Sequence, residues 1–395
     1  MASDVSASPV PSDTLETPPL GHYLSVMEQV MTTTATLDRK TDGAWRAAQS
    51  RPRADRIADD KALLRTAAEL SRDLNTARPA IYWADTIASA ALGYAALAGA
   101  ILLSGGWAVA SGIVAVFALY RAGSFIHEVS HMKHGQVPGY RLAWNLLVGI
   151  PLMIPSFMYE GVHNLHHAKT RYGTVDDPEY LPLALMKPWS VPLFVVASAL
   201  GPIALMFRFA VLSPISLAVP ALRRTIAARY SALAINPAFR RRDAQGEPRK
   251  LWVRLEIATS IWVIGLLALV AVGVVPLRAL VIFVGILSAT MVINQIRTLV
   301  AHLWENDGEA MTVTAQYLDS VNVPPPSLLP ALWAPVGLRY HALHHLLPGV
   351  PYHSLGEAHR RLSAVVDAQS PYHKASYAGL PGLLNRLVRS TFGAR

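Results

Sequence analysis

Cysteine is absent from this chain of 395 residues, and charged side chains are scarce. The absence of cysteine excludes disulfides, zinc ribbons, cysteine-ligated iron–sulfur clusters and a fused rubredoxin domain. Only 15% of the residues are charged while 52% are hydrophobic, and the mean hydropathy is +0.31. So little charge beside so many apolar residues indicates a membrane protein.

Acidic residues are fewer than basic ones, with 26 Asp and Glu against 35 Lys and Arg, which gives a formal net charge of +9. In membrane proteins, basic residues gather in the loops that face the cytoplasm. This tendency accounts for the excess of positive charge, and we expect no nucleic-acid partner.

Histidine is the residue type whose placement is least random. Eight of the fourteen histidines lie in three short clusters, HEVSH at residues 127–131 within FIHEVSHMKH, HNLHH at 163–167 and HALHH at 341–345. Residues three or four apart share one face of a helix, so we expect each cluster to direct two or three imidazoles at one point.

A metal explains this arrangement better than packing does. Neutral imidazole binds iron, zinc, copper and nickel, whereas packed histidines without a metal would bury many unpaired nitrogens. Eight or nine imidazoles exceed what one ion coordinates, so we expect two metal ions. The residue pattern alone leaves the identity of the metal open.

The first cluster also has a second interpretation. HEVSH at residues 127–131 matches the HExxH pattern, in which two histidines bind zinc and Glu128 acts as a general base. An intramembrane zinc protease of this kind needs an aspartate ligand on a later membrane helix, and none of the four long apolar stretches carries one deep inside. The protease interpretation also leaves the other two clusters without a role. Because all the cluster histidines are intact, a non-catalytic scaffold is a weaker third interpretation.

Four apolar stretches have the length of about 20 residues that crossing a bilayer requires. They form two pairs with very short connections: Tyr82–Leu103 with Trp107–Ile126, and Ile257–Pro276 with Ala279–Leu299. We therefore expect an all-α integral membrane protein with four transmembrane helices in two hairpins. The loop between the pairs is rich in arginine, which places it and both termini in the cytoplasm. The histidine clusters then form a cap on the cytoplasmic side.

Two other apolar runs, Leu142–Met158 and Val191–Leu212, complicate this count. Both contain prolines, and the second contains Arg208. A single crossing by either run would separate histidine clusters onto opposite faces of the membrane. We therefore expect both runs to be embedded from the cytoplasmic side without crossing.

The chain divides into four parts. Residues 1–53 begin with a Ser-, Pro- and Thr-rich stretch that lacks the features of a signal peptide, so we expect a disordered or irregular tail. Residues 54–80 have the apolar period of an amphipathic helix on the cytoplasmic face. Residues 81–365 form the membrane domain, and residues 366–395 form a C-terminal tail.

With these motifs in this order, the chain resembles the membrane-bound fatty acid desaturase and hydroxylase superfamily over roughly residues 82–362. That superfamily has three histidine boxes at the cytoplasmic ends of two helical hairpins, and HEVSH, HNLHH and HALHH stand as its first, second and third boxes. Members often add a histidine after the fourth helix in an Asn-x-x-x-His pattern. The matching stretch TLVAHLW supplies His302 but has Thr298 where the asparagine would stand.

The resemblance implies two iron ions held almost wholly by imidazole, with O₂ as co-substrate. The implied ligands are His127, His131, His163, His166, His167, His302, His341, His344 and His345. We expect His134 at the surface, and His353 and His359 in structural roles.

Ligating histidines usually donate their second N–H to a carboxylate or a carbonyl group. The acids beside the boxes are candidates for this role, namely Glu128, Glu160, Asp176, Asp177, Glu179, Glu305 and Asp307. Asp177 is favoured because it closely follows the second box and precedes Pro178, which stiffens the segment. Glu160 and Glu305 are the next candidates.

The resemblance implies an O₂-dependent oxidoreductase of the inner membrane whose site faces the cytoplasm, and we expect it to desaturate a long fatty acyl chain. Hydroxylation of a lipid, alkane or carotenoid and decarboxylation of a fatty acid to a terminal alkene use the same kind of site and stay open. Electrons would come from a separate ferredoxin-, rubredoxin- or cytochrome-type donor, since the chain has neither cysteine nor an HPGG haem motif. We expect the aromatic residues near the boxes to be membrane-interface anchors: Trp144, Phe157, Tyr159 and Trp304.

Overall fold

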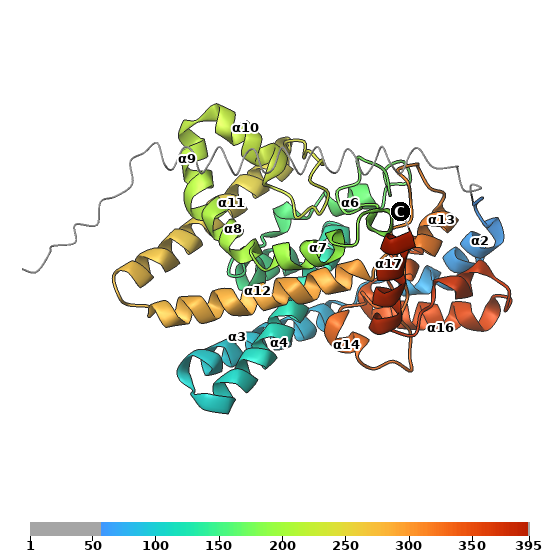
Figure 1. Cartoon of the computed structure of the whole chain (residues 1–395), viewed down its shortest axis with the longest axis horizontal. Coiled ribbons are helices and arrows are strands. Elements are labelled where there is room, and N and C mark those ends of the chain that lie inside the picture. Colours follow the sequence, from blue (N-terminus) through green and yellow to red (C-terminus); the bar gives the residue numbers. More distant parts are fainter. Residues whose placement is uncertain (1–56, 394–395) are drawn as a thin grey trace, which may run out of the picture.

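The computed structural model describes residues 57–393 and is built from helices (Figure 1). No strand occurs in this part of the chain, where backbone pairing outside helices is limited to isolated bridges. The all-α expectation is therefore confirmed for residues 57–393. The expected N-terminal tail, residues 1–53, lies outside the described residues.

The elements follow one another along the chain in the order α2 (Lys61–Leu70), η1 (Arg72–Leu74), α3 (Pro79–Leu102), α4 (Gly105–His131), α5 (Tyr140–Trp144), η2 (Asn145–Gly149), η3 (Ser156–Met158), α6 (His163–His166), η4 (Leu183–Leu185), α7 (Ser190–Ser198), α8 (Gly201–Phe207), η5 (Arg208–Leu212), α9 (Ser213–Ala218), α10 (Pro220–Arg229), α11 (Gly246–Ala271), α12 (Leu277–Leu299), α13 (Val313–Asp319), α14 (Pro330–Trp333), α15 (His341–Leu346), η6 (Tyr352–Ser354), α16 (Leu355–Val365), η7 (Pro371–Ala375) and α17 (Leu380–Gly393).

Small residues hold the first hairpin, α3 and α4, together. Pro79 occupies the first turn of α3, where its missing N–H removes no helical hydrogen bond. Gly93 of α3 lies so close to α4 that a Cβ there would stand 2.5 Å from the side chain of Leu119. Helices in an apolar solvent associate through such close packing, because hydrophobic burial gives no driving force there.

Five helical segments within residues 57–393 are long and apolar enough to cross a membrane, namely Pro79–Leu102, Gly105–His131, Gly201–Ala218, Gly246–Ala271 and Leu277–Leu299. Four of them correspond to the four predicted spans, and the protein is an integral membrane protein. The additional candidate, Gly201–Ala218, lies largely in the second ambiguous run. It joins α8 and α9 through the π-helical turn η5.

The chain around this additional segment returns on itself. The backbone N–H of Ile235 donates to the carbonyl of Pro178 (2.9 Å), and the side-chain amide of Asn236 donates to the carbonyl of Asp177 (2.8 Å). Residues 178 and 235 are therefore neighbours, although the whole of α7 to α10 lies between them. The intervening segment leaves this place and comes back to it.

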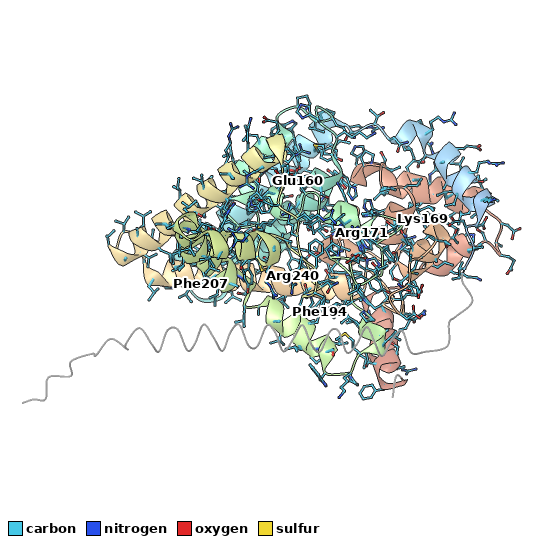
Figure 2. All side chains as sticks on the ribbon, turned by 90° about the horizontal axis from the view of Figure 1, so that it is seen from above. Glu160, Lys169, Arg171, Phe194, Phe207 and Arg240 are labelled. Carbon is cyan, nitrogen blue, oxygen red and sulfur yellow. The ribbon has the colours of Figure 1, made fainter. Side chains whose placement is uncertain are left out.

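Helices α2, α13, α16 and α17 gather at one end of the hairpins, where they form a cap (Figure 1). The predicted amphipathic helix is present as α2, which buries Leu63 and Ala67 in the cap core. Seen from above, Lys169 and Arg171 lie toward the cap, whereas Phe207 of α8 lies toward the far ends of the hairpins (Figure 2). Phe207 is 48% exposed, as suits a side chain in contact with lipid.

The expected C-terminal tail, residues 366–395, contains η7 and α17, which pack against the cap. Asn322 connects this segment to the third histidine cluster. Its backbone N–H donates to the carbonyl of Ala375 (2.7 Å), and its carbonyl accepts from the N–H of Tyr377 (2.8 Å). Its side-chain oxygen accepts from the N–H of Leu343 (3.0 Å).

Candidate metal centre

The structure brings all nine histidines implied by the resemblance together, in two adjoining groups. The five-histidine group contains His127, His131, His163, His167 and His344. The four-histidine group contains His166, His302, His341 and His345. Within each group, one nitrogen from every member lies within 4.8 Å of those of the others.

Four elements supply these side chains. The last turn of α4 carries His127 and His131, which are four residues apart on one helical face. The short helices α6 and α15 carry the second and third clusters, and His302 follows the end of α12.

The expectation that each cluster points at one place is wrong for the second and third clusters. His163 and His167 belong to the five-histidine group, whereas His166 belongs to the four-histidine group. Adjacent residues on a helix point about 100° apart, so His166 and His167 face different ways. These two clusters therefore lie between the groups and supply both.

Within each group, most Nε2 atoms face one another. In the five-histidine group, Nε2 of His344 lies 3.0 Å from that of His131 and 3.1 Å from that of His167. In the four-histidine group, Nε2 of His341 lies 3.0 Å from that of His302 and 3.2 Å from that of His345. Convergent Nε2 atoms are what a shared ion requires.

The Nδ1 atoms of three of these rings point outward to hydrogen-bond acceptors. His166 Nδ1–H donates to both oxygens of Asp177 (3.0 and 2.9 Å), and His163 Nδ1–H donates to Glu179 (2.7 Å). His302 Nδ1–H donates to the hydroxyl of Tyr172 (2.8 Å). A proton held on Nδ1 leaves the Nε2 lone pair free for a metal.

The preferred acid, Asp177, lies against the second box as expected. It is fully buried and also accepts from the backbone N–H groups of Gly173 and Glu179, both at 2.8 Å. Burial lowers the pKa of His166, but the charge of Asp177 outweighs that effect and the net pKa is raised. Burial raises the pKa of Glu179 to about 7.

Burial also lowers the pKa of the histidines of the third box and of the histidine after α12, and there no carboxylate offsets it. It lowers the pKa of each of them well below the usual range, so these rings are neutral and keep a lone pair for a metal: His302, His341, His344 and His345.

Sequence reasoning missed the support behind His302. The hydroxyl of Tyr172 donates to Asp319 (2.8 Å) and Ser320 Oγ lies 3.1 Å from His302 Nδ1. Burial raises the pKa of Asp319 to about 6. Asp319 lies at the end of α13, 22 residues before the third box. Nothing in its local sequence marks it as a partner of His302.

The other two acids named from the sequence lie elsewhere. Glu160 pairs with Arg141 (2.6 Å), and Glu305 pairs with Arg386 (3.0 Å) where both side chains are about half exposed. Neither carboxylate bonds to a histidine of the two groups in the described part of the chain.

The histidines expected outside the metal site do lie outside both groups. His134 is exposed. His353 Nε2 accepts from the backbone N–H of Arg78 (3.1 Å), and His359 Nδ1 lies 2.8 Å from the hydroxyl of Tyr372.

The four aromatic residues expected as interface anchors are buried instead, at 0 to 9% exposure: Trp144, Phe157, Tyr159 and Trp304. Their polar atoms are bonded inside the protein. For example, Trp304 Nε1–H donates to the carbonyl of Leu299 (2.9 Å), and the Tyr159 hydroxyl donates to Glu179 (2.7 Å). Tyr159 and Trp304 lie against His163 and His302, whereas Trp144 and Phe157 pack in the hydrophobic core.

The donor set fits a pair of first-row transition ions. Two nitrogens on opposite sides of an ion, with bonds of about 2.1 Å, stand about 4.2 Å apart, which the 4.8 Å spread of each group accommodates. His127 is buried and neither of its ring nitrogens has a hydrogen-bond partner among residues 57–393. Such burial is unfavourable unless a metal takes one of them.

A cavity of about 290 Å³ extends from these groups between α4, α8 and α12. Its wall includes His127, His166, His302 and His341. Most of the remaining wall surface is apolar, with leucine, isoleucine and methionine side chains from the hairpins and from the segments around residues 152–154 and 233–235. The cavity therefore connects the metal centre with a space suited to a lipid chain.

Residues 104–378 match the fatty acid desaturase family, which is more than half of the chain. The chain belongs to this family. A ceramide hydroxylase from Caulobacter vibrioides (strain NA1000 / CB15N) is 49% identical to it over 335 residues, which cover 85% of this chain and 95% of that protein.

Membership of the fatty acid desaturase family identifies the protein as an oxygen-using oxidoreductase. Members of the family typically hold two irons, in agreement with the two histidine groups. The zinc protease interpretation of HEVSH falls, because both of its histidines belong to a group completed by the second and third boxes.

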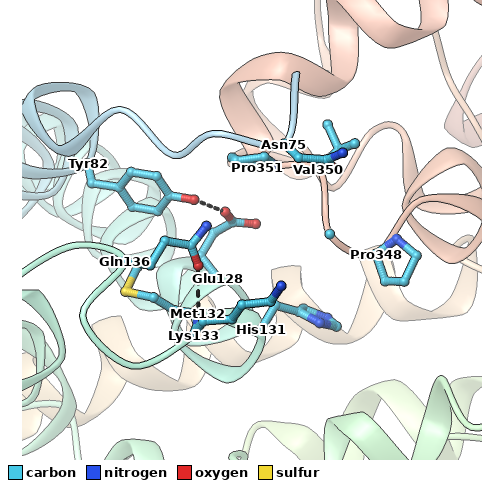
Figure 3. Close-up of a pocket in the computed structure, with 11 residues that line it drawn as sticks. Asn75, Tyr82, Glu128, His131, Met132, Lys133, Gln136, Pro348, Val350 and Pro351 are labelled. Carbon is cyan, nitrogen blue, oxygen red and sulfur yellow. Dashed lines mark hydrogen bonds between the residues drawn. The ribbon is translucent and has the colours of Figure 1, made fainter. Parts of the chain in front are cut away.

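In this family member, a second, more polar pocket of about 330 Å³ reaches His131 of the five-histidine group (Figure 3). His131, Glu128 and Lys133 line it together with residues 348–351. Figure 3 shows the Tyr82 hydroxyl directed at Glu128, to which it donates a hydrogen bond. Glu128 also accepts from the backbone N–H of Tyr352 (3.2 Å), so it ties α3 and α4 to the segment after the third box.

Proposed function

We propose that this protein hydroxylates the hydrocarbon part of an amide-linked membrane lipid of the ceramide class. The observation that carries the proposal is the pair of histidine groups at the head of a largely apolar cavity. The relationship to a ceramide hydroxylase at 49% identity favours hydroxylation over the desaturation that the sequence analysis preferred.

The nine histidines of the two groups would hold two iron ions, whose chemistry is the activation of O₂. The reaction balances as R–H + O₂ + 2 e⁻ + 2 H⁺ → R–OH + H₂O, in which the C–H bond is broken and one oxygen atom enters the product. The two electrons come from a separate donor of the ferredoxin, rubredoxin or cytochrome type. The absence of cysteine from the chain supports this external supply.

The contributions of the protein's own side chains are orientation and exclusion of water. Asp177 and Glu179 keep a proton on Nδ1 of His166 and His163, so that both rings present Nε2 inward. The apolar wall of the cavity holds the lipid chain beside the centre and keeps bulk water away from it.

For residues 81–365, we propose four spans with the histidine cap on the cytoplasmic face of the inner membrane. Gly201–Ala218 then enters and leaves from the same side. The hydrogen bonds of Ile235 and Asn236 to residues 177 and 178 support this, because a single crossing would carry the later residues to the other face. The proposal is supported as well by the adjoining positions of His131, at the end of α4, and His302, just after α12, because both helices then end on the same side.

The experiment is turnover by the purified, iron-loaded protein in lipid nanodiscs, with ¹⁸O₂, an electron donor, and either a ceramide or a free fatty acid. We expect one ¹⁸O atom in the ceramide product and about two irons per chain. A product that has lost two hydrogens without gaining oxygen would replace hydroxylation with desaturation. A terminal alkene from the free acid would indicate decarboxylation.

A further inference from the structure

Arg297 of α12 is a cation at the head of the lipid cavity, where the carboxyl group of Glu179 acts on it only at longer range. In the described part of the chain no carboxylate forms an ion pair with it. Its Nε has no hydrogen-bond partner there, and one terminal nitrogen reaches only Asn294 Oδ1, at 3.5 Å. The hydroxyl of Tyr120 is its other neighbour.

Two other arginines with little exposure, Arg208 and Arg241, have hydrogen-bond partners within residues 57–393. Arg208 pairs with Glu256 (3.0 Å) and donates to two serines. Arg241 donates to carbonyls that include that of Glu160 (2.9 Å), and its guanidinium lies 4.3 Å from the Trp252 ring centre. The fold supplies hydrogen-bond acceptors for these two guanidinium groups, so a general lack of partners does not explain the unpaired Nε–H of Arg297. A charge in a membrane helix without a partner marks a site of function.

The neighbours of Arg297 make one end of the cavity polar. Asn294, Gln295 and Thr298 line the same wall, and His302 and His341 border the same space. The other end is apolar, with Leu119, Leu152 and Leu287. The polar end of the cavity is therefore the end at the metal centre.

Next to the apolar end, α8 packs against α12. There, Gly201 lies close to Met291, and a Cβ on the glycine would stand 2.4 Å from the flexible methionine sulfur. Beyond this contact lies an apolar groove of about 520 Å³ whose lining includes Phe207 and Val284. Val284 is about 20 Å from Arg297 along α12. The length suits a lipid tail that lies with its polar end at Arg297.

We infer that Arg297 donates hydrogen bonds to the acyl carbonyl oxygen of the lipid and so holds the carbons next to that carbonyl at the metal centre. This inference rests on the proposed function and deepens it. Oxygen then enters near the polar end of the substrate. In an arrangement that oxidises the middle of a chain, the polar recognition site would lie far from the metal centre instead.

Three variants test the inference. Arg297→Gln removes the charge, Arg297→Lys keeps it without the planar donor pair, and Arg278→Gln makes the same change at an exposed arginine near the other end of α12. For Arg297→Gln we expect a KM for ceramide raised about 10- to 100-fold, the range for a hydrogen bond from a charged group. Its product should be hydroxylated at several positions, and its iron content should be that of the wild type. The KM of Arg297→Lys should lie between those of the wild type and Arg297→Gln, and the KM of Arg278→Gln should equal that of the wild type.

Substrates with and without the acyl carbonyl group test whether that group is what Arg297 binds. A ceramide and a free fatty acid of the same chain length should both lose affinity in Arg297→Gln, whereas an analogue with the amide carbonyl reduced to CH₂ should bind wild type and variant equally. Unchanged KM and position of hydroxylation would overturn the inference, and so would a loss of iron that accounts for the loss of activity.

Binding of ceramide to the metal-free protein gives a measurement that does not depend on turnover. Weaker binding by Arg297→Gln of about tenfold or more supports the inference, and equal binding overturns it. If the wild type binds ceramide through Arg297 but oxidises neither lipid, the proposed function fails while the binding role of Arg297 stands.

Discussion

The five-histidine group and the four-histidine group differ in how they meet the rest of the protein. Every ring of the four-histidine group is buried, and its outward bonds go to Asp177, Tyr172 and Ser320. In the five-histidine group two rings are only partly buried, and His131 lines the polar pocket of Figure 3. The two halves of the centre are therefore not interchangeable. One is fully buried and borders the lipid cavity, and the other has a polar approach and one more histidine.

The largest effect is expected from a ligand of the enclosed group. His166→Ala leaves three imidazoles there, so we expect product formation to fall by more than the roughly 100-fold that marks loss of an outer partner. Iron should drop to about one per chain. Iron analysis measures the metal content and mass spectrometry measures the product. Retained turnover would show that the second box is not part of the metal centre.

His131→Ala should lose less iron than His166→Ala, because four imidazoles stay in the five-histidine group. The matched control is His134→Ala, an exposed histidine one turn further on, which should keep both iron and activity. Equal loss of iron in His131→Ala and His166→Ala would show the two groups to be equivalent. Equal loss in His134→Ala would place that residue among the ligands.

The outer carboxylates sharpen the comparison further. Asp177→Asn keeps the shape of the side chain but weakens the acceptor for His166, so we expect iron affinity to fall about 10- to 100-fold. Glu179→Gln should have a smaller effect, because Glu179 supports the group with more ligands and lacks the backbone donors that fix Asp177. Titration of the metal-free proteins with ferrous iron compares the two, and the reverse order would contradict the assignment.

The smallest effect is expected for Glu305→Gln. This change breaks an exposed pair with Arg386, which is worth at most about 1 kcal/mol of folding free energy. Iron content and product should equal those of the wild type. A loss of iron in this variant would return Glu305 to the support of the centre.

Spacing along the chain was enough to find the eight box histidines, because helical period is a local property, whereas His302 was named from the family resemblance. All nine residues named from the sequence meet in the structure. The division of the second and third clusters between two groups was not predicted, since it depends on the orientation of α6 and α15 in the cap. The support of His302 by Tyr172 and Asp319 depends on contacts between distant segments.

The fold shows the same limit. The hairpin helices follow from long apolar runs, but Gly201–Ala218 has the length and composition of a span as well. Only contacts between residues on either side of it, such as Ile235 with Pro178, indicate that the chain returns. Glu160 and Glu305 were named for nearness in sequence, while arginines from other segments decide where they lie.

The bonds of Asn322 have a practical meaning for anyone who prepares this enzyme. Because one asparagine is bonded both to the third box and to the segment around Ala375, shortening the chain from its carboxyl end would disturb the third box before any of its histidines is touched.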